Sequence, residues 1–197
     1  MYIKLKTKQM KNILLIPFIF VTLACKSQQV YPLNTDFDEV PQNSYLKDLN
    51  NELDAYTGTY KANFQDREIT LYISKETMRF FKALNVYKDA LSIRYIVKNS
   101  MGNFLQDTQS MTFQPNQFKY TIYSQGTYPN QNIAWFNYGG TNCGVGWGSI
   151  RLKKLNSTQI SWEYIPNSTI IDSNKCPSGT DTTIYLPETK DLIFTKQ

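Results

Sequence analysis

Hydrophobic and polar residues alternate with a period of two along most of the chain after residue 56. Ile69, Leu71 and Ile73, for example, alternate with Thr70, Tyr72 and Ser74. This period is typical of β-strands with one buried face. The pattern predicts strands at 56–63, 68–74, 91–98, 109–113, 118–124, 133–138, 146–155, 158–165, 182–186 and 191–195.

A helical period occurs once, before the strands begin. Leu46, Leu49 and Leu53 are spaced at i, i+3 and i+7, which predicts a short helix over 44–53 that packs on a larger body. Turn residues separate the later strands roughly every 8–12 residues, a spacing typical of antiparallel proteins. We therefore expect an all-β fold, an antiparallel β-barrel of about 8–10 strands with one short N-terminal helix, and a β-sandwich as the alternative.

The N-terminus has the pattern of an export signal. Four lysines precede a short apolar run at 13–21, which ends in Ala24-Cys25. The run is too short for a bilayer span, which needs roughly 20 apolar residues. We expect a signal peptide over 1–24, with translation starting at Met1 or Met10. Lipidation is expected at Cys25, because bacterial lipoprotein signals place a small residue before a cysteine; ordinary cleavage that leaves a free thiol is the alternative.

The predicted cleavage also defines the mature chain. Residues 25–43 have no clear period and are predicted to be a lipidated N-terminus and tether, followed by a single β-rich domain over 44–197. Four of the 21 basic residues lie in the signal, which leaves 17 against 16 acidic residues. A nucleic-acid-binding protein would show a basic excess, so no nucleic-acid partner is expected.

Histidine is absent from the chain, which excludes Ser-His-Asp and Cys-His catalysis and histidine metal sites. Cys143 and Cys176 are the cysteines left once Cys25 is lipidated. In an exported protein such a pair predicts a disulfide, with two buried thiols as the alternative. The carboxylates at 36–39 and 52–54 are expected on the surface. We expect no metal and no cofactor.

Aromatic residues on the predicted strands are the candidates for a binding site. Tyr60, Trp135, Trp147 and Trp162 are candidates to line an apolar cavity inside a barrel. The alternative is that they are ordinary core residues, which is the commoner role of aromatic side chains on strands.

Several segments resemble an uncharacterised family of small β-rich lipoproteins from flavobacteria and their relatives. The matching segments are 24–28, 31–35, 45–60, 162–164, 176–177 and 184–187. The resemblance implies a lipid-anchored β-rich protein and no particular activity. Gly58-Thr59-Tyr60 is also similar to the Gly-x-Trp opening of the lipocalins, with tyrosine in place of tryptophan. The Thr-Asp-Tyr turn and the final helix of lipocalins are missing, so no lipocalin ligand is implied.

Taken together, the sequence favours a lipid-anchored protein of the cell envelope, with the outer membrane as the expected location. We expect it to bind a small apolar molecule or an envelope component without catalysis. A structural or protein-interaction module is the alternative, and an enzyme that uses carboxylates ranks third. The expected partners are the membrane, through the N-terminal lipid, and an apolar ligand or envelope protein.

Overall fold

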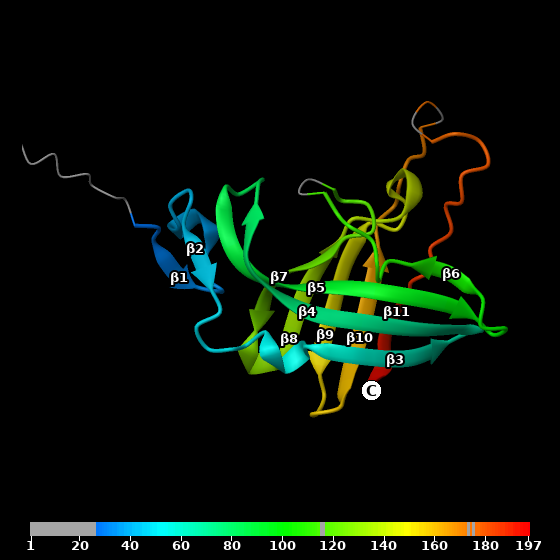
Figure 1. Ribbon diagram of the computed structural model, residues 1–197, viewed down its shortest axis with the longest axis horizontal. Coiled ribbons are helices and arrows are strands. Elements are labelled where there is room, and N and C mark those ends of the chain that lie inside the picture. The colour runs from blue at the N-terminus through cyan, green and yellow to red at the C-terminus, as the bar shows by residue number, and fades with distance from the viewer. Residues whose placement is uncertain (1–26, 115–116, 173, 175) are drawn as a thin grey trace, which may run out of the picture.

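The protein is an all-β molecule whose main body is a closed antiparallel barrel (Figure 1). The computed structural model describes residues 27–114, 117–172, 174 and 176–197. Within these residues eleven strands form one sheet. They are β1 (Val30–Pro32), β2 (Tyr45–Lys47), β3 (Gly58–Phe64), β4 (Arg67–Phe81), β5 (Val86–Asn99), β6 (Phe104–Asp107), β7 (Ile122–Tyr128), β8 (Ile133–Tyr138), β9 (Gly148–Lys154), β10 (Gln159–Pro166) and β11 (Thr189–Lys196).

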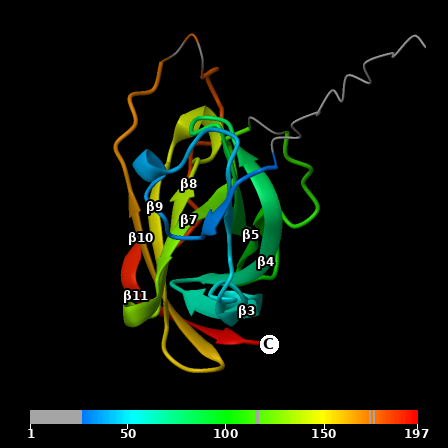
Figure 2. The same cartoon turned by 90° about the vertical axis from the view of Figure 1, so that its left-hand side faces the viewer.

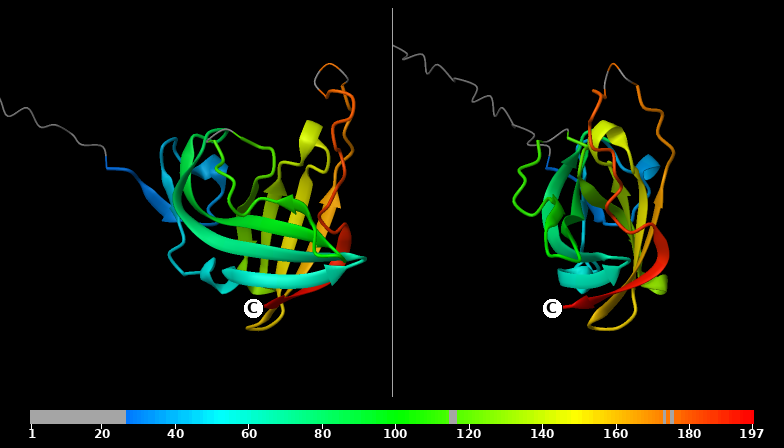
Figure 3. Two further views of the ribbon diagram at one scale, coloured as in Figure 1. Left: turned by 45° about the vertical axis from the view of Figure 1, so that its right-hand side comes forward. Right: turned by 90° about the vertical axis from the view of Figure 1, so that its right-hand side faces the viewer.

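Eight of these strands close the barrel in the order β5-β4-β3-β11-β10-β9-β8-β7. The ring closes where β7 returns to β5, with Ser92 paired to Tyr123 and the backbone N–H of Leu91 donating to Ser124 Oγ at 2.8 Å. β4 and β5 are 15 and 14 residues long and curve around one side of the molecule (Figure 3). Strands of this length bend across both layers, so the chain forms a barrel and not a sandwich.

The barrel interior is filled by the residues that alternate inward. Ile69, Leu71 and Ile73 of β4 face Val97, Tyr95 and Ile93 of β5 in register, and all six are buried. The same alternation buries Ala134, Phe136 and Tyr138 on β8 and Ile160, Trp162 and Tyr164 on β10. The predicted period-two pattern therefore defines the core, as expected for a sheet with one buried face.

The predicted helix over 44–53 is wrong. Residues 45–47 form strand β2, which pairs in parallel with β5, and the only helical turns nearby are short 3-10 segments, η1 (Phe37–Glu39) and η2 (Asp54–Tyr56). The three leucines do not share one face: Leu46 is buried in a small cluster with Val40 and Val86, whereas Leu53 is buried in the barrel core and Leu49 is exposed.

The expected spacer is also folded over residues 30–43. β1 pairs in parallel with β2, and Leu33 is buried in the barrel core. The Asn34 side chain donates to Thr127 Oγ1 at 2.8 Å and accepts from the Thr127 backbone N–H at 3.0 Å. This segment shows no hydrophobic period because single residues, and not one continuous face, anchor it to one end of the barrel. The folded part of the chain therefore begins before Ser44.

Two predicted strands are absent from the described sheet, those at 109–113 and 182–186. Phe113 instead lies under the guanidinium of Arg94, 3.6 Å from its ring centroid, and β6 at 104–107 takes the pairing with β5. The predictions for the signal peptide and for Cys25 lie outside the described residues. Among the described residues, no helix has the length and apolar character to cross a membrane.

Candidate functional site

Large aromatic side chains occupy the barrel interior. Trp162, Tyr164 and Phe194 are among the bulkiest fully buried residues. The Trp162 ring lies 5.7 Å from Phe194 and 6.2 Å from Tyr164, measured between centroids, and its Nε1–H donates to the carbonyl of Pro187 at 2.9 Å. Its one polar atom is therefore satisfied, and the ring packs as core.

Three buried tyrosines continue this packing towards one end of the barrel. The Tyr95 and Tyr138 hydroxyls lie 3.0 Å apart, and the Tyr164 hydroxyl donates to the carbonyl of Gly146. Burial raises the pKa of Tyr138 to about 12 and raises the pKa of Tyr95 and of Tyr164 as well. The three phenols therefore stay protonated at neutral pH and act as hydrogen-bonding core residues, not as bases.

The four aromatic residues proposed to line a cavity are not brought together. Tyr60 and Trp162 are buried inside the barrel. Trp135 points to the outside of β8, next to Gly126 and Arg151 on the neighbouring strands, and Trp147 lies in a loop with 47 % of its surface exposed. These residues therefore belong to the core, the outer wall and a loop, in keeping with alternation along the strands.

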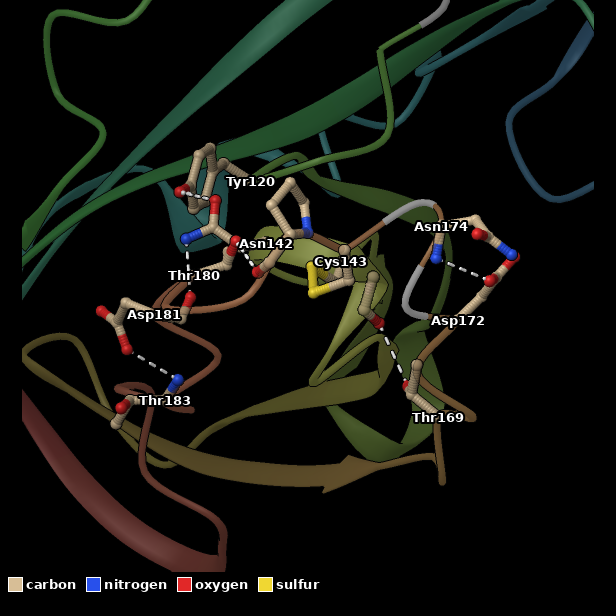
Figure 4. Close-up of a disulfide and its surroundings, with 12 residues drawn as sticks. Tyr120, Asn142, Cys143, Thr169, Asp172, Asn174, Thr180, Asp181 and Thr183 are labelled. Atoms are coloured by element: carbon tan, nitrogen blue, oxygen red, sulfur yellow. Dashed lines mark hydrogen bonds between the residues drawn. A yellow bond between two sulfur atoms is a disulfide. The ribbon is translucent and has the colours of Figure 1, made fainter.

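The predicted disulfide is confirmed. Cys143 and Cys176 are bonded, with Cα atoms 5.5 Å apart, and they connect the loop after β8 to the long segment between β10 and β11 (Figure 4). Side chains reinforce the link: Asn142 Nδ2 donates to the Asp181 carbonyl at 2.7 Å, and Thr169 Oγ1 donates to the Gly144 carbonyl at 3.2 Å. The described residues of the segment from 167 to 188 are thus fixed at one end of the barrel.

The last part of that segment is held against the barrel by Arg67. Its Nη1 donates to the carbonyls of Ile184 at 3.3 Å and Tyr185 at 3.1 Å. Its guanidinium carbon lies 5.6 Å from the centroid of the Tyr185 ring. The neighbouring Leu186 is buried with the core. Residues 184–186 therefore act as a plug, apolar towards the interior and joined to β4 by a charged hydrogen-bond donor.

Two hollows lie on either side of Arg67, and the smaller of them also borders the plug. One has a volume of about 430 Å³ and lies between the β3–β4 turn and the end of β5; it is lined by Asn63, Gln65, Asp66, Arg67, Glu68, Lys98, Asn99, Ser100 and Gly102. The other, of about 250 Å³, is lined by Phe64, Gln65, Arg67, Ile184, Leu186 and Glu188. Gln65 and Arg67 line both hollows, so we take the larger, with Arg67 at its border, as the candidate site and name it the Arg67 hollow.

The Arg67 hollow offers polar chemistry. Amides, a guanidinium, an ammonium and carboxylates line it, and Glu68 faces Lys98 across the β4–β5 register. Such a lining suits a neutral ligand rich in hydroxyl and amide groups more than an apolar one. In the described part of the chain, no group of three or more His, Cys, Asp or Glu side chains is placed to hold a metal ion.

A buried acidic cluster lies elsewhere, beneath the segment before β3. Asp89 accepts from the Tyr45 hydroxyl at 2.6 Å and from the backbone N–H of Met78 and Asp48, both at 3.0 Å. Asp48 pairs with Lys75 at 2.8 Å. These carboxylates are saturated by donors, so the cluster fixes the fold. Asp54 belongs to the surface, as expected, although it also pairs with Lys75 at 2.9 Å.

Sequence reasoning missed Arg67 and its plug. The plug is separated from Arg67 by more than a hundred residues along the chain. The contact uses backbone carbonyls, which every residue type has, so the sequence of the plug does not indicate it. A faint signal exists in the Gln65-Asp66 turn that precedes Arg67, since it predicts that the arginine lies at the start of a strand and at the rim of the sheet.

Comparison with known proteins adds one assignment. No curated protein and no solved structure matches the chain. A family model does match, over residues 10–197. Because the match covers nearly the whole sequence, it applies to the barrel, the plug and the disulfide together: the chain belongs to the family of unknown function DUF6705.

Proposed function

We propose that this protein is a non-enzymatic binding module of the bacterial cell envelope that binds its ligand on the outside of the barrel. One observation carries the proposal: aromatic side chains fill the barrel interior, while the Arg67 hollow outside it is polar. A packed barrel is a rigid scaffold, and rigid scaffolds commonly present binding residues at their rims.

The proposal includes export and anchoring. The N-terminal pattern supports a signal peptide over 1–24 and lipidation at Cys25, as in the flavobacterial lipoproteins that the chain resembles, and so an outer-membrane location. The Cys143–Cys176 disulfide supports the same address, because disulfides persist mainly in oxidising compartments outside the cytoplasm.

The ligand class follows from the lining of the hollow. Asn63 and Gln65 offer amide donors and acceptors. Asn99 offers its amide donor, because its Oδ1 already accepts from the backbone N–H groups of Met101 and Asn103. Amide donors and acceptors beside the guanidinium of Arg67 suit a hydroxyl- and amide-rich glycan. We propose an envelope glycan, with peptidoglycan fragments as the first probe.

The second candidate is a carrier of a small apolar molecule, one of the two kinds of ligand expected from the sequence beside an envelope component. Ile184 and Leu186 favour it, because they form an apolar stopper at one end of the barrel. A carrier would have to displace this plug and rearrange buried rings such as Trp162. We rank it second because that rearrangement exposes apolar surface to water.

Native mass spectrometry of the protein isolated from its own cell envelope distinguishes the two. Soluble muropeptides added to the protein should bind, and Arg67→Ala should weaken that binding. Arg151→Ala is the matched control, because Arg151 is an exposed arginine on β9 whose nearest carboxylate is 3.8 Å away. An apolar molecule released from the isolated protein on denaturation would establish the carrier instead, and no muropeptide binding would contradict the glycan.

A further inference from the structure

A row of apolar and aromatic residues crosses four strands outside the barrel. Val30 pairs with Tyr45, Tyr45 with Tyr87, and Tyr87 with Phe80. Paired residues of neighbouring strands point to the same face of a sheet, so these four side chains, which we name the aromatic row, form one surface. Val30 is 52 % exposed and Phe80 is 43 % exposed, and the Phe80 and Tyr87 rings lie 5.1 Å apart.

Only one face of this four-strand extension is open. The opposite face carries Leu46 and Val86, which are buried under Val40 and Phe37. The covering segment also holds the exposed acidic residues of η1, Asp38 and Glu39. The open face is bordered by more apolar residues of the β4–β5 hairpin, namely the exposed Met78 and Leu84.

Two exposed lysines lie near the aromatic row, whereas Lys88 of β5 is buried on the covered face, with its Nζ 5.0 Å from the Phe37 ring centroid. Lys47 is two residues from Tyr45 on β2, so alternation places it on the same face, and Lys82 follows β4 in the hairpin turn. Both lysines are exposed. The open face therefore combines apolar residues with positive charge, whereas the acidic residues of η1 lie on the covered side.

The described chain begins at this same place. Gln28 Nε2 donates to the carbonyl of Asn43 at 2.9 Å, and the Asn43 N–H donates to the carbonyl of Asn85 in the hairpin turn at 2.7 Å. Figure 2 shows this N-terminal part of the chain, in blue, in front of the barrel, and Figure 1 shows β1 as the outermost strand of the extension, with β2 between it and β5. Val30 is five residues after Cys25, so an extended chain separates their Cα atoms by at most about 17 Å. The row itself spans about 15 Å across four strands.

We propose that the aromatic row rests on the surface of the bilayer that holds the acyl chains of Cys25. This inference depends on the proposed lipidation. A tether that ended at residue 43 would have let the barrel move far from the membrane, but the fold of residues 30–43 shortens the free chain to a few residues. Whatever surface lies beside the anchor must then face the lipid, and that surface is the aromatic row.

The chemistry of the row fits a lipid headgroup region. Tyrosine and phenylalanine rings are amphipathic or apolar and are favoured where water meets hydrocarbon. The Tyr45 hydroxyl is already bonded to Asp89, so its ring can leave water without losing a hydrogen bond. Lys47 and Lys82 attract anionic headgroups while their aliphatic stems lie along the apolar surface.

Site-specific fluorescence in vesicles tests the proposal. The full-length lipidated protein is reconstituted in phosphatidylethanolamine–phosphatidylglycerol vesicles with an environment-sensitive dye on an introduced cysteine, either Phe80→Cys or Leu84→Cys. Apart from Cys25 and the bonded Cys143–Cys176 pair, the chain has no other cysteine. Leu155→Cys is the control, because Leu155 is 46 % exposed in the β9–β10 turn, away from the hairpin in Figure 1.

We expect doxyl-labelled lipids to remove most of the fluorescence at positions 80 and 84 and little at position 155. Lipidated protein with no quenching at 80 and 84 would overturn the inference while leaving the anchor standing. A dye that is shielded from aqueous iodide but not quenched by the lipids would show that a protein, either a second copy or another partner, covers the row, and would also overturn it. An unacylated Cys25 in the mass spectrum would defeat both the anchor and the inference.

Discussion

At the scale of single residues, two tryptophans that were both predicted to lie on strands have opposite roles. Trp162 is fully buried between Tyr164 and Phe194, whereas Trp147 is about half exposed in a loop. Composition and local pattern do not distinguish them, because the difference depends on which strands close the ring. Whether such a ring is buried decides, however, whether the barrel interior is a packed core or a cavity. It therefore also decides how much a substitution of the ring destabilises the protein.

Trp162→Ala should destabilise the protein by about 3–5 kcal/mol, the usual cost of removing a large buried aromatic side chain. Trp147→Ala, the matched control, should change the free energy of unfolding by less than about 0.5 kcal/mol, as exposed substitutions do. Urea unfolding followed by circular dichroism measures both. A near-neutral Trp162→Ala would mean that the ring lines an empty or ligand-filled space.

Lys88 gives a pH-dependent prediction. It is buried on β5, with Nζ donating to the Gln125 carbonyl at 2.6 Å, and desolvation lowers its pKa from 10.5 to about 8. The unfolded chain therefore binds more protons than the native protein between about pH 8 and 10.5, so the Lys88 contribution to stability rises with pH across that window. Below pH 8 the buried amine is charged, and its desolvation lowers the free energy of unfolding.

Unfolding free energies of the native protein and of Lys88→Met, measured at pH 7.5 and pH 10, check this contribution. The difference between the two proteins should shift in favour of the lysine form at the higher pH, by on the order of 1–3 kcal/mol. Buried tyrosines also titrate at high pH, but they are common to both proteins and cancel. Equal differences at the two pH values would show that Lys88 is solvated.

At the scale of elements, the disulfide secures the segment from 167 to 188. Cys143 and Cys176 are 33 residues apart, and closing a loop of that length contributes about 3–4 kcal/mol in the chain-entropy model. The double variant Cys143→Ser/Cys176→Ser should lose about that much stability. Hydrogen exchange should accelerate most in residues 167–183, whereas residues 184–188, held by Arg67, should change less. Uniform acceleration through the barrel strands would contradict this localised role.

The strands were predictable from sequence where their neighbours are near in the chain. The β3–β4 and β9–β10 hairpins follow from alternation and turn residues such as Gln65-Asp66, and the structure confirms both. The predicted helix fails because Leu46 and Leu53 are buried in separate clusters, and a helical spacing cannot report that. The Arg67 hollow was not predictable, because it depends on a contact between β4 and a segment without regular structure.

At the scale of the whole molecule, the N-terminal segment is part of the folded body. Leu33→Ala should destabilise the protein by about 2–4 kcal/mol, since Leu33 is buried in the barrel core and its truncation leaves a cavity. Val30→Ala, three residues earlier and half exposed, should have little effect. Thermal unfolding of the two variants measures these changes. An unchanged stability of Leu33→Ala would show that the N-terminal segment is a tether that does not contribute to the folded body.

The pairing of β3 with β11 has a consequence for how the protein is made. Tyr60 pairs with Lys196, and the Gln197 N–H donates to the carbonyl of Thr59 at 2.9 Å. The seam of the barrel thus joins residues almost 140 positions apart, and no partial chain can form it. A polypeptide that emerges from a ribosome or a translocation channel N-terminus first must wait, with β3 unpaired on one side, until residues 189–196 arrive. Contacts of such long sequence separation slow folding, so the nascent protein needs protection from association until its final strand is delivered.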